Sequence, residues 1–168
     1  PLGVACASGN WRLARFLLER GAKTEPVGGQ PALLAAAGTE DDDAAGVQLL
    51  LRHKARVDAR DARGRSALHE AAAAGHAGIC AVLLDAGADA RGRDGEGRTP
   101  LLDAARAGSS DALEALLAAQ ADPRDCDAAG TNALHLACGA EAPSGAIVRR
   151  LLALGVDPQG RDADGRSA

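Results

Sequence analysis

The sequence predicts an all-α repeat solenoid, a row of short helix pairs connected by hairpin-like loops. Two motifs that recur at a fixed spacing and a near absence of aromatic residues lead to this prediction. Aromatic residues make up 1% of the chain and are represented only by Trp11 and Phe16. A single large core normally contains more rings, because each ring buries a large apolar area. A core of alanine and leucine therefore indicates thin layers of closely packed helices.

The first motif begins with a glycine that steps along the chain from position 64 to 97, 130 and 165, in intervals of 33, 33 and 35 residues. It reads GRSALH at 64–69, GRTPLL at 97–102, GTNALH at 130–135 and GRSA at 165–168. A second motif, a pair of leucines before a short polar end, occurs at 17–18, 50–51, 83–84, 116–117 and 151–152. Repetition of this period is typical of stacked helical units.

The first helix of each unit follows the glycine motif. In the unit 61–93, Ser66 is a suitable N-cap, because its hydroxyl can accept a bond from a free backbone N–H. Leu68, Ala71 and Ala72 then form a narrow apolar stripe at i, i+3 and i+4. Gly75 ends this helix.

The second helix carries the leucine pair. Ile79, Val82 and Leu83 form its apolar stripe, and Gly87 ends it because glycine adopts the left-handed conformation without steric cost. The polar, glycine-containing segment from Asp89 onward is predicted to be an exposed hairpin. Neither helix can bury its stripe alone, so neighbouring units must stack.

These residues resemble the ankyrin repeat, a 33-residue unit with the motif Thr-Pro-Leu-His-x-Ala. Residues 99–101 match the Thr-Pro-Leu of this motif, and 66–72 followed by Gly75-His76 match the pattern almost position by position. The resemblance extends over the whole chain and implies L-shaped units, each with a helix-turn-helix and a β-hairpin loop.

The chain is therefore expected to be one ankyrin-repeat domain, 1–168. Its units are 1–25 (partial), 26–60, 61–93, 94–126, 127–161 and 162–168 (partial), and those at 26–60 and 127–161 each have two extra residues. A solenoid end normally carries a polar cap. Neither end has one, so we expect a fragment of a longer array.

Three residues depart from the family pattern. Lys54 and Gln120 stand where the family has its helix-ending glycine, so the second helices of these units are expected to end differently. Arg150 stands where the family has an apolar residue. Its stem can lie along apolar surface with its charge in water, or the insertion before it rotates the helix.

Composition excludes several classes of function. A net charge of −4 argues against general nucleic-acid binding, which requires a basic surface. No apolar run reaches the ~18 residues of a membrane span. We find no nucleophile–base arrangement and no cofactor motif, and so expect no enzyme and no cofactor. The cysteines match no zinc pattern. We expect four reduced thiols, three of them buried, which is compatible with a reducing compartment. The chain is expected to be an intracellular, cytoplasmic monomer.

Three histidines and one acidic run are further candidates for a role. By the resemblance, His69 and His135 link neighbouring turns through hydrogen bonds. His76–Cys80 and His135–Cys138 have a spacing that allows metal ligation, although both pairs match structural positions of the family. The run at 40–43, Glu-Asp-Asp-Asp, is either a solvated loop that starts a helix or a contact for a cation or a basic partner.

Arginines are concentrated in the predicted hairpins, where aspartates recur at fixed positions. Asp61, Asp94, Asp127 and Asp162 begin their units, and such recurrence indicates turn-making. The arginines form either a solvated, charge-balanced edge or a ridge for an acidic partner. For the ridge, Arg63, Arg65 and Arg98 are expected to be exposed and dispensable for folding. The candidate partner-binding residues are Arg63, Arg65, Arg93, Arg98, Arg106 and Thr131.

The resemblance implies a scaffold or adaptor whose concave face, formed by hairpins and first helices, binds a protein or peptide partner, possibly an acidic one. The alternative is a regulatory or substrate-recruiting arm of a larger enzyme, channel or ubiquitin-ligase complex. The fold alone does not choose between these functions.

Overall fold

The computed structural model describes residues 1–26, 29–140 and 143–168, and within them ten α-helices form five pairs. The pairs are α1 (Leu2–Ala7) with α2 (Trp11–Glu19), α3 (Ala32–Ala37) with α4 (Ala45–Arg52), α5 (Ala67–Ala74) with α6 (Ala77–Asp85), α7 (Pro100–Ala107) with α8 (Ser110–Ala118), and α9 (Ala133–Cys138) with α10 (Gly145–Ala153). The predicted all-α repeat solenoid is confirmed.

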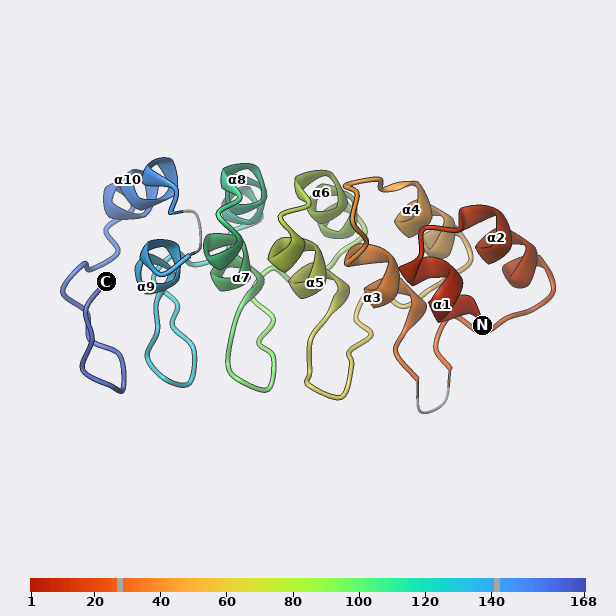
Figure 1. The fold of residues 1–168 in the computed structure, drawn as a ribbon, viewed down its shortest axis with the longest axis horizontal. Coiled ribbons are helices and arrows are strands. Elements are labelled where there is room, and N and C mark those ends of the chain that lie inside the picture. The colour runs from red at the N-terminus through yellow and green to blue at the C-terminus, as the bar shows by residue number, and fades with distance from the viewer. Residues whose placement is uncertain (27–28, 141–142) are drawn as a thin grey trace.

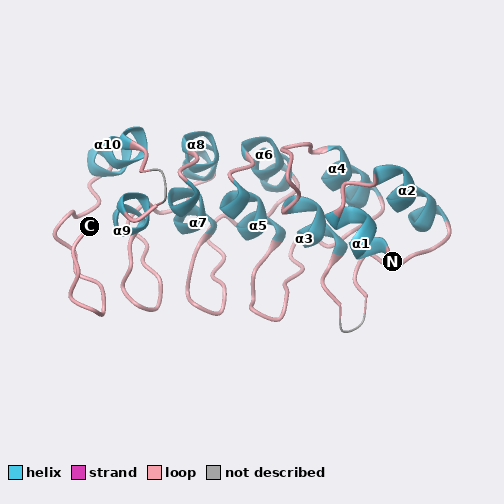
Figure 2. Ribbon diagram, in the orientation of Figure 1, coloured by secondary structure: helices cyan, strands magenta, loops and turns pink. Residues whose placement is uncertain are grey.

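The helices lie in two rows. The first helices of the pairs form an inner row and the second helices an outer row, and long loops project from the inner row on the side away from the outer one (Figure 1). These projections are loops rather than strands (Figure 2). Within the described ranges the only bridges of β type are two isolated ones, Arg60 with Ser66 and Cys126 with Asn132.

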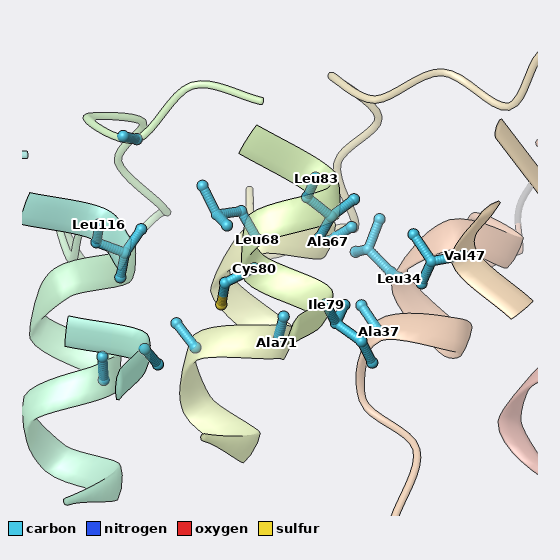
Figure 3. Close-up of a cluster of buried hydrophobic side chains, with 14 of the residues drawn as sticks. Leu34, Ala37, Val47, Ala67, Leu68, Ala71, Ile79, Cys80, Leu83 and Leu116 are labelled. Carbon is cyan, nitrogen blue, oxygen red and sulfur yellow. The ribbon is translucent and has the colours of Figure 1, made fainter. Parts of the chain in front are cut away.

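The apolar stripes predicted for residues 61–93 form the core of the stack. Leu68, Ala71 and Ala72 of α5 and Ile79 and Leu83 of α6 are 0–1% exposed. Their partners come from the neighbouring pairs as well as their own, because α5 contacts both α3 and α7. Figure 3 shows Ile79 beside Ala37 of the preceding unit. Burial of each stripe therefore requires the next unit.

The helix ends follow the sequence prediction at α5. The Ser66 hydroxyl accepts a hydrogen bond from the His69 N–H, and His69 reaches back to the Ser66 N–H in a reciprocal cap. Gly75 ends the helix in the left-handed conformation, with φ of 78°.

The second helices end in one way throughout, and the expectation for Lys54 and Gln120 is wrong. Both adopt left-handed backbone, with φ of 63° and 64°, as Gly21, Gly87 and Gly155 do at the same position. The next backbone N–H still bonds back to the helix, from Ala55 to Leu50 and from Ala121 to Leu116. Closure of the turn outweighs the cost of the side chain, which is about 1–2 kcal/mol.

The aspartates make the turns of the loops, as predicted. The Oδ1 atom of Asp61 accepts bonds from the N–H groups of Arg63 and Arg65 at 2.8 and 2.9 Å. Asp94, Asp127 and Asp162 repeat this pair of bonds in their own loops. One carboxylate thus fixes each loop tip.

The cysteine prediction is wrong in one place. Cys6 and Cys80 are buried, whereas Cys126 and Cys138 are exposed. Cys138 occupies the helix position of Ala72 and Ala105, which the following inner helix covers. The residues after α10 form loop, so no helix covers Cys138 in the same way.

Arg150, which stands where the family has an apolar residue, forms an ion pair with the preceding outer helix. Its Nε and Nη2 atoms donate to the two carboxylate oxygens of Glu114, at 2.6 and 3.0 Å. Glu114 belongs to α8, the preceding outer helix, so the pair bridges two units. Of the helices that the structure describes, none has the length and apolar character needed to cross a membrane.

Replacing Leu83 with alanine should lower the free energy of unfolding by about 2–5 kcal/mol, because the side chain is 0% exposed in the middle of the stack. Leu84→Ala is the matched control: Leu84 is only half-buried and should cost less. Urea unfolding followed by circular dichroism measures both. Equal losses for the two variants would contradict the assignment of the inner stripe.

Replacing Gln120 with glycine should raise the free energy of unfolding by about 0.5–1 kcal/mol, because glycine adopts φ of 64° without steric cost. Gln120→Ala should give no gain, since it retains the Cβ atom. Thermal and urea unfolding test the pair. A stabilisation by alanine as large as that by glycine would show that the backbone is not the cause.

Candidate binding surface

The inner helices and the loops carry all six candidate residues, but most of these residues are already engaged within the chain. Arg63, in the loop before α5, is exposed, and its described contacts come from its backbone. Arg65 and Arg98 stand at equivalent positions two residues before α5 and α7, and both are partly buried. The expectation that both would be exposed is therefore wrong.

Arg65 lies in a network of three carboxylates. Its guanidinium contacts Glu70 at 2.8 Å, Asp103 at 3.1 Å and Asp94 at 3.5 Å, and its side chain is 13% exposed. Asp94 and Asp103 belong to the following unit. Arg65 therefore joins two units, and the expectation that it is dispensable for folding conflicts with this geometry.

Asp103 is the buried member of this network. Its side chain is 0% exposed, with Arg65 3.1 Å from Oδ2 and Arg106 3.5 Å from Oδ1. Neither oxygen receives a well-directed hydrogen bond, so the attraction is mainly between the charges. Burial raises the pKa of the Asp103 carboxyl above its ordinary value, and Arg65 opposes the shift. Asp103 thus depends on its arginines to remain charged.

Arg98 repeats part of the pattern one unit later. Its guanidinium lies 3.1 Å from Glu96 and 3.7 Å from Asp127 of the next unit, and its side chain is 29% exposed. Arg65–Asp94 and Arg98–Asp127 are equivalent pairs, each of which runs from one unit to the next. Thr131 stands at the same position in the following unit, where it is half-buried and has no charge.

Other loop arginines hold backbone carbonyls. The Nη1 atom of Arg60 donates to Gly64 and Arg93, and that of Arg93 donates to Gly97 and Cys126, at 2.7–2.9 Å. Arg93 also pairs with Asp125.

Two further arginines reach carbonyls in the turns that follow the next outer helices: Arg91 donates to Gln120, after α8, and Arg124 donates to Leu154, after α10. These arginines are exposed, but their guanidinium groups bond to the next unit and so connect consecutive units.

Arg63 and Arg106 remain as the candidates with the most accessible charge. Arg106 projects from α7 with its side chain 49% exposed, and Asp103 holds one edge of its guanidinium at 3.5 Å. Most of its N–H groups therefore remain available to a partner carboxylate. The sequence analysis did not identify Asp103 as a partner of Arg65. The signal was present, because Asp103 stands one 33-residue unit after Glu70, which is itself five residues after Arg65.

The histidines link neighbouring units, as the resemblance implied. His69 Nε2 lies 3.1 Å from the carbonyl oxygen of Arg98, and His135 Nε2 lies 3.0 Å from that of Arg166. His76 Nδ1 lies 3.3 Å from the Ala37 carbonyl oxygen, while Cys80 is buried in the core. Over the described ranges, no three side chains of the metal-binding types converge on one point.

The acidic run at 40–43 caps two helices. The carboxylate of Asp42 accepts from the N–H groups of Gly78 and Ile79 at 2.8 and 2.9 Å, at the start of α6 in the next unit. Asp43 accepts from the Ala45 N–H, at the start of α4. The expected helix-starting role is therefore present, and one of the aspartates extends it across the unit boundary.

The geometry defines a class of protein: a helical repeat array whose loops and polar side chains connect each unit to the next. The family model for ankyrin repeats, in three copies, matches residues 2–94, 33–127 and 88–162. The chain belongs to the ankyrin-repeat family. No curated protein matches it. Proteins of this family generally mediate interactions between proteins.

Replacing Arg65 with alanine should lower the free energy of unfolding by about 3 kcal/mol, because it leaves the buried carboxylate of Asp103 with one distant arginine. Arg63→Ala is the control and should stay within about 0.5 kcal/mol of the original chain. Urea unfolding measures both. A change for Arg65→Ala as small as that for Arg63→Ala would contradict the structural role.

His69 should make the stability depend on pH. Burial lowers the pKa of its imidazole in the folded state, although the bond to Arg98 opposes the shift. The unfolded chain therefore binds the proton more readily, and stability should fall as pH decreases below about 6.5, the ordinary value for histidine. Replacement by leucine, the residue at the equivalent positions Leu34 and Leu102, should remove this contribution. Unfolding free energies measured from about pH 7.5 to 5 test it; parallel profiles for the two proteins would contradict it.

Proposed function

We propose that the chain is a scaffold or adaptor module whose inner-helix and loop face binds an acidic segment of another protein. The proposal rests mainly on the exposure of Arg106 and on its contact with Asp103. Arg106 is a charged side chain on the inner row with half of its surface exposed and one edge already oriented by a buried carboxylate. A guanidinium that is held in place loses less conformational freedom on binding, and its fork can pair with a carboxylate in two places.

Arg63 and Thr131 extend this candidate surface along the array. Arg63 lies in the loop before α5, and Thr131 lies in the loop before α9, on the side from which the loops project (Figure 1). Leu136 of α9 is half-buried and occupies the helix position of Asp103. A partner that crosses the inner helices would thus meet charge at α7 and an apolar side chain at α9.

Arg65, Arg93 and Arg98 have a secondary part in this proposal. Their charges are largely matched by carboxylates or carbonyls of the chain itself. Recruiting them to a partner would require breaking contacts that hold the units together. We therefore assign partner contact to Arg106 and Arg63 and stacking to Arg65, Arg93 and Arg98.

The double replacement Arg63→Glu and Arg106→Glu should weaken binding to a partner captured by cross-linking at least about tenfold, because two attractive contacts become repulsive. Arg63→Glu should change stability little, because its side chain is exposed. Arg106→Glu puts a second carboxylate beside the buried Asp103 and should cost some stability, so circular dichroism must show that the double variant is folded at the temperature of the titration. Arg149→Glu, which alters an exposed arginine on the outer helix α10, is the matched control and should leave the affinity unchanged. Isothermal titration calorimetry with the purified partner measures all three proteins.

The affinity of the original chain should also decrease as salt is raised from about 50 to 300 mM, since accessible charge pairs are screened. Undiminished binding by the double variant would contradict the assignment of this face.

A further inference from the structure

Polar ties recur at equivalent positions between consecutive units. Three kinds occur: an imidazole bonded to a carbonyl of the next unit, an arginine at the end of a unit that bonds to carbonyls of the next unit, and an inner-face arginine that pairs with carboxylates. At the 93/94 boundary all three are present, made by His69, Arg93 and Arg65. The boundary between units 94–126 and 127–161, called the 126/127 boundary, differs in each of them.

The imidazole tie is missing at the 126/127 boundary, because Leu102 stands where the units on either side have His69 and His135. The ring of His69 also pairs with the residue that caps its helix, since its Nδ1 atom lies 2.8 Å from the Ser66 hydroxyl. Thr99 is the corresponding cap before α7. It is 1% exposed, and its hydroxyl has no hydrogen-bond partner within the described part of the chain. Leu102 thus keeps the apolar packing but leaves a buried hydroxyl unpaired, which costs stability.

The arginine at the end of the unit is also missing. Arg60, Arg93 and Arg161 end their units, whereas Cys126 ends unit 94–126. The Nη1 atoms of Arg60 and Arg93 each donate to two carbonyls of the following unit at 2.7–2.9 Å. That of Arg161 donates to the Gly165 carbonyl at 2.7 Å. The short thiol of Cys126 is a weak donor and cannot replace this fork.

The inner-face pair is weaker at the 126/127 boundary. Arg65 lies 3.1 Å from the buried Asp103, whereas Arg98 lies 3.7 Å from Asp127. The Nε atom of Arg98 is buried without a hydrogen-bond partner among the described residues. Leu136, at the position of Asp103, offers Arg98 no charge.

Apolar packing still crosses the 126/127 boundary, together with a bond between loop tips and two contacts of exposed arginines. These are Ala128 with Glu96, Arg150 with Glu114 and Arg124 with Leu154. Exposed ion pairs contribute little to stability, so these contacts do not replace the missing ties.

From these differences we infer that the 126/127 boundary is the point at which the array opens first. Helices α9 and α10 separate together from α7 and α8, beside which they lie in Figure 1, while the earlier units stay stacked. Repeat arrays open between units because each unit is held only by its neighbours. Each missing hydrogen bond shifts this equilibrium toward the open state by about two- to tenfold. The comparison is between two complete units and does not depend on what precedes or follows residues 1–168.

The 126/127 boundary also divides the candidate binding surface. Arg106 lies on α7 and Leu136 lies on α9. A partner that contacts both would bind the closed form and hold it closed, so its apparent affinity would depend on the opening equilibrium. This consequence rests on the proposed function. The opening itself is a property of the free chain, and measurements without a partner test it whether or not Arg106 binds one.

Hydrogen–deuterium exchange read by mass spectrometry tests the opening. The closing variant, Leu102→His with Cys126→Arg, takes both residue types from equivalent positions of this chain. The amides of α9 and α10 should exchange at least about fivefold more slowly than in the original chain, and those of α1–α4 at the same rate. Unchanged exchange in α9 and α10 would show that they open only as the last complete unit, and would overturn the inference. Equal slowing in all helices would overturn it as well.

The converse variant, His69→Leu with Arg93→Cys, gives the 93/94 boundary the residue types of the 126/127 boundary. Exchange should become at least about fivefold faster in α7–α10 and stay the same in α1–α4. An increase of equal size in all helices, or no increase, would contradict the role assigned to the ties.

Two controls separate the ties from general effects. Ala129→Arg adds an arginine at an exposed position of the loop before α9 and should leave the exchange unchanged. An effect as large as that of Cys126→Arg would mean that charge alone is responsible, against the inference. Circular dichroism verifies folding. If Leu102→His does not fold, Cys126→Arg alone should still slow exchange in α9 and α10 at least about threefold, and no slowing would refute the proposal.

Discussion

Contact between one unit and the next is the constraint on which the whole structure depends. Each helix is too short and its apolar stripe too narrow to form a core within its own pair, so burial is completed by neighbours. Ala72 and Ala105 are fully buried under the following inner helix, whereas Cys138, at the same helix position, is exposed where loop follows instead. The small side chains follow from the same constraint. Alanine lets the inner helices approach closely, and an array with only two aromatic residues can still bury its leucines.

The polar side chains serve the same contact. Asp42 caps a helix of the next unit, His69 reaches the next loop, and Arg91 donates to the turn after the next outer helix. An arginine that pairs with a carboxylate of the following unit gains from charge, but each buried ion also loses hydration, so removing one partner should cost more stability than replacing both. The high arginine content of the loops is therefore first a property of stacking. We propose that Arg63 and Arg106, whose charges stacking engages least, are the arginines that meet a partner.

Much of this could be read from the sequence, because the informative signals are local. The cap by Ser66, the left-handed Gly75 and the turns made by Asp61 depend on residues within a few positions of one another. The burial of the Arg65 side chain could not be predicted from nearby residues. Its exposure depends on Asp103, 38 positions away, and on how closely two inner helices approach. Lys54 and Gln120 show a second limit. A residue type that disfavours the left-handed conformation still adopts it when the hydrogen bonds of the turn and the packing of the next unit demand it. The sequence thus predicted that the arginines lie in the loops, but not which of them the next unit engages.

A double-mutant cycle on Arg65 and Asp103 tests most directly whether charges of the inner face hold consecutive units together. The unit 127–161 supplies suitable residue types, because Thr131 stands at the position of Arg65, two units on, and Leu136 at that of Asp103, one unit on. Unfolding free energies of Arg65→Thr, Asp103→Leu and the double variant give the coupling energy between the two side chains. If the pair joins the units, the double variant should be less destabilised than the sum of the single variants, by at least about 1 kcal/mol. Single effects that add within about 0.5 kcal/mol would show that the two charges act independently and would contradict this account.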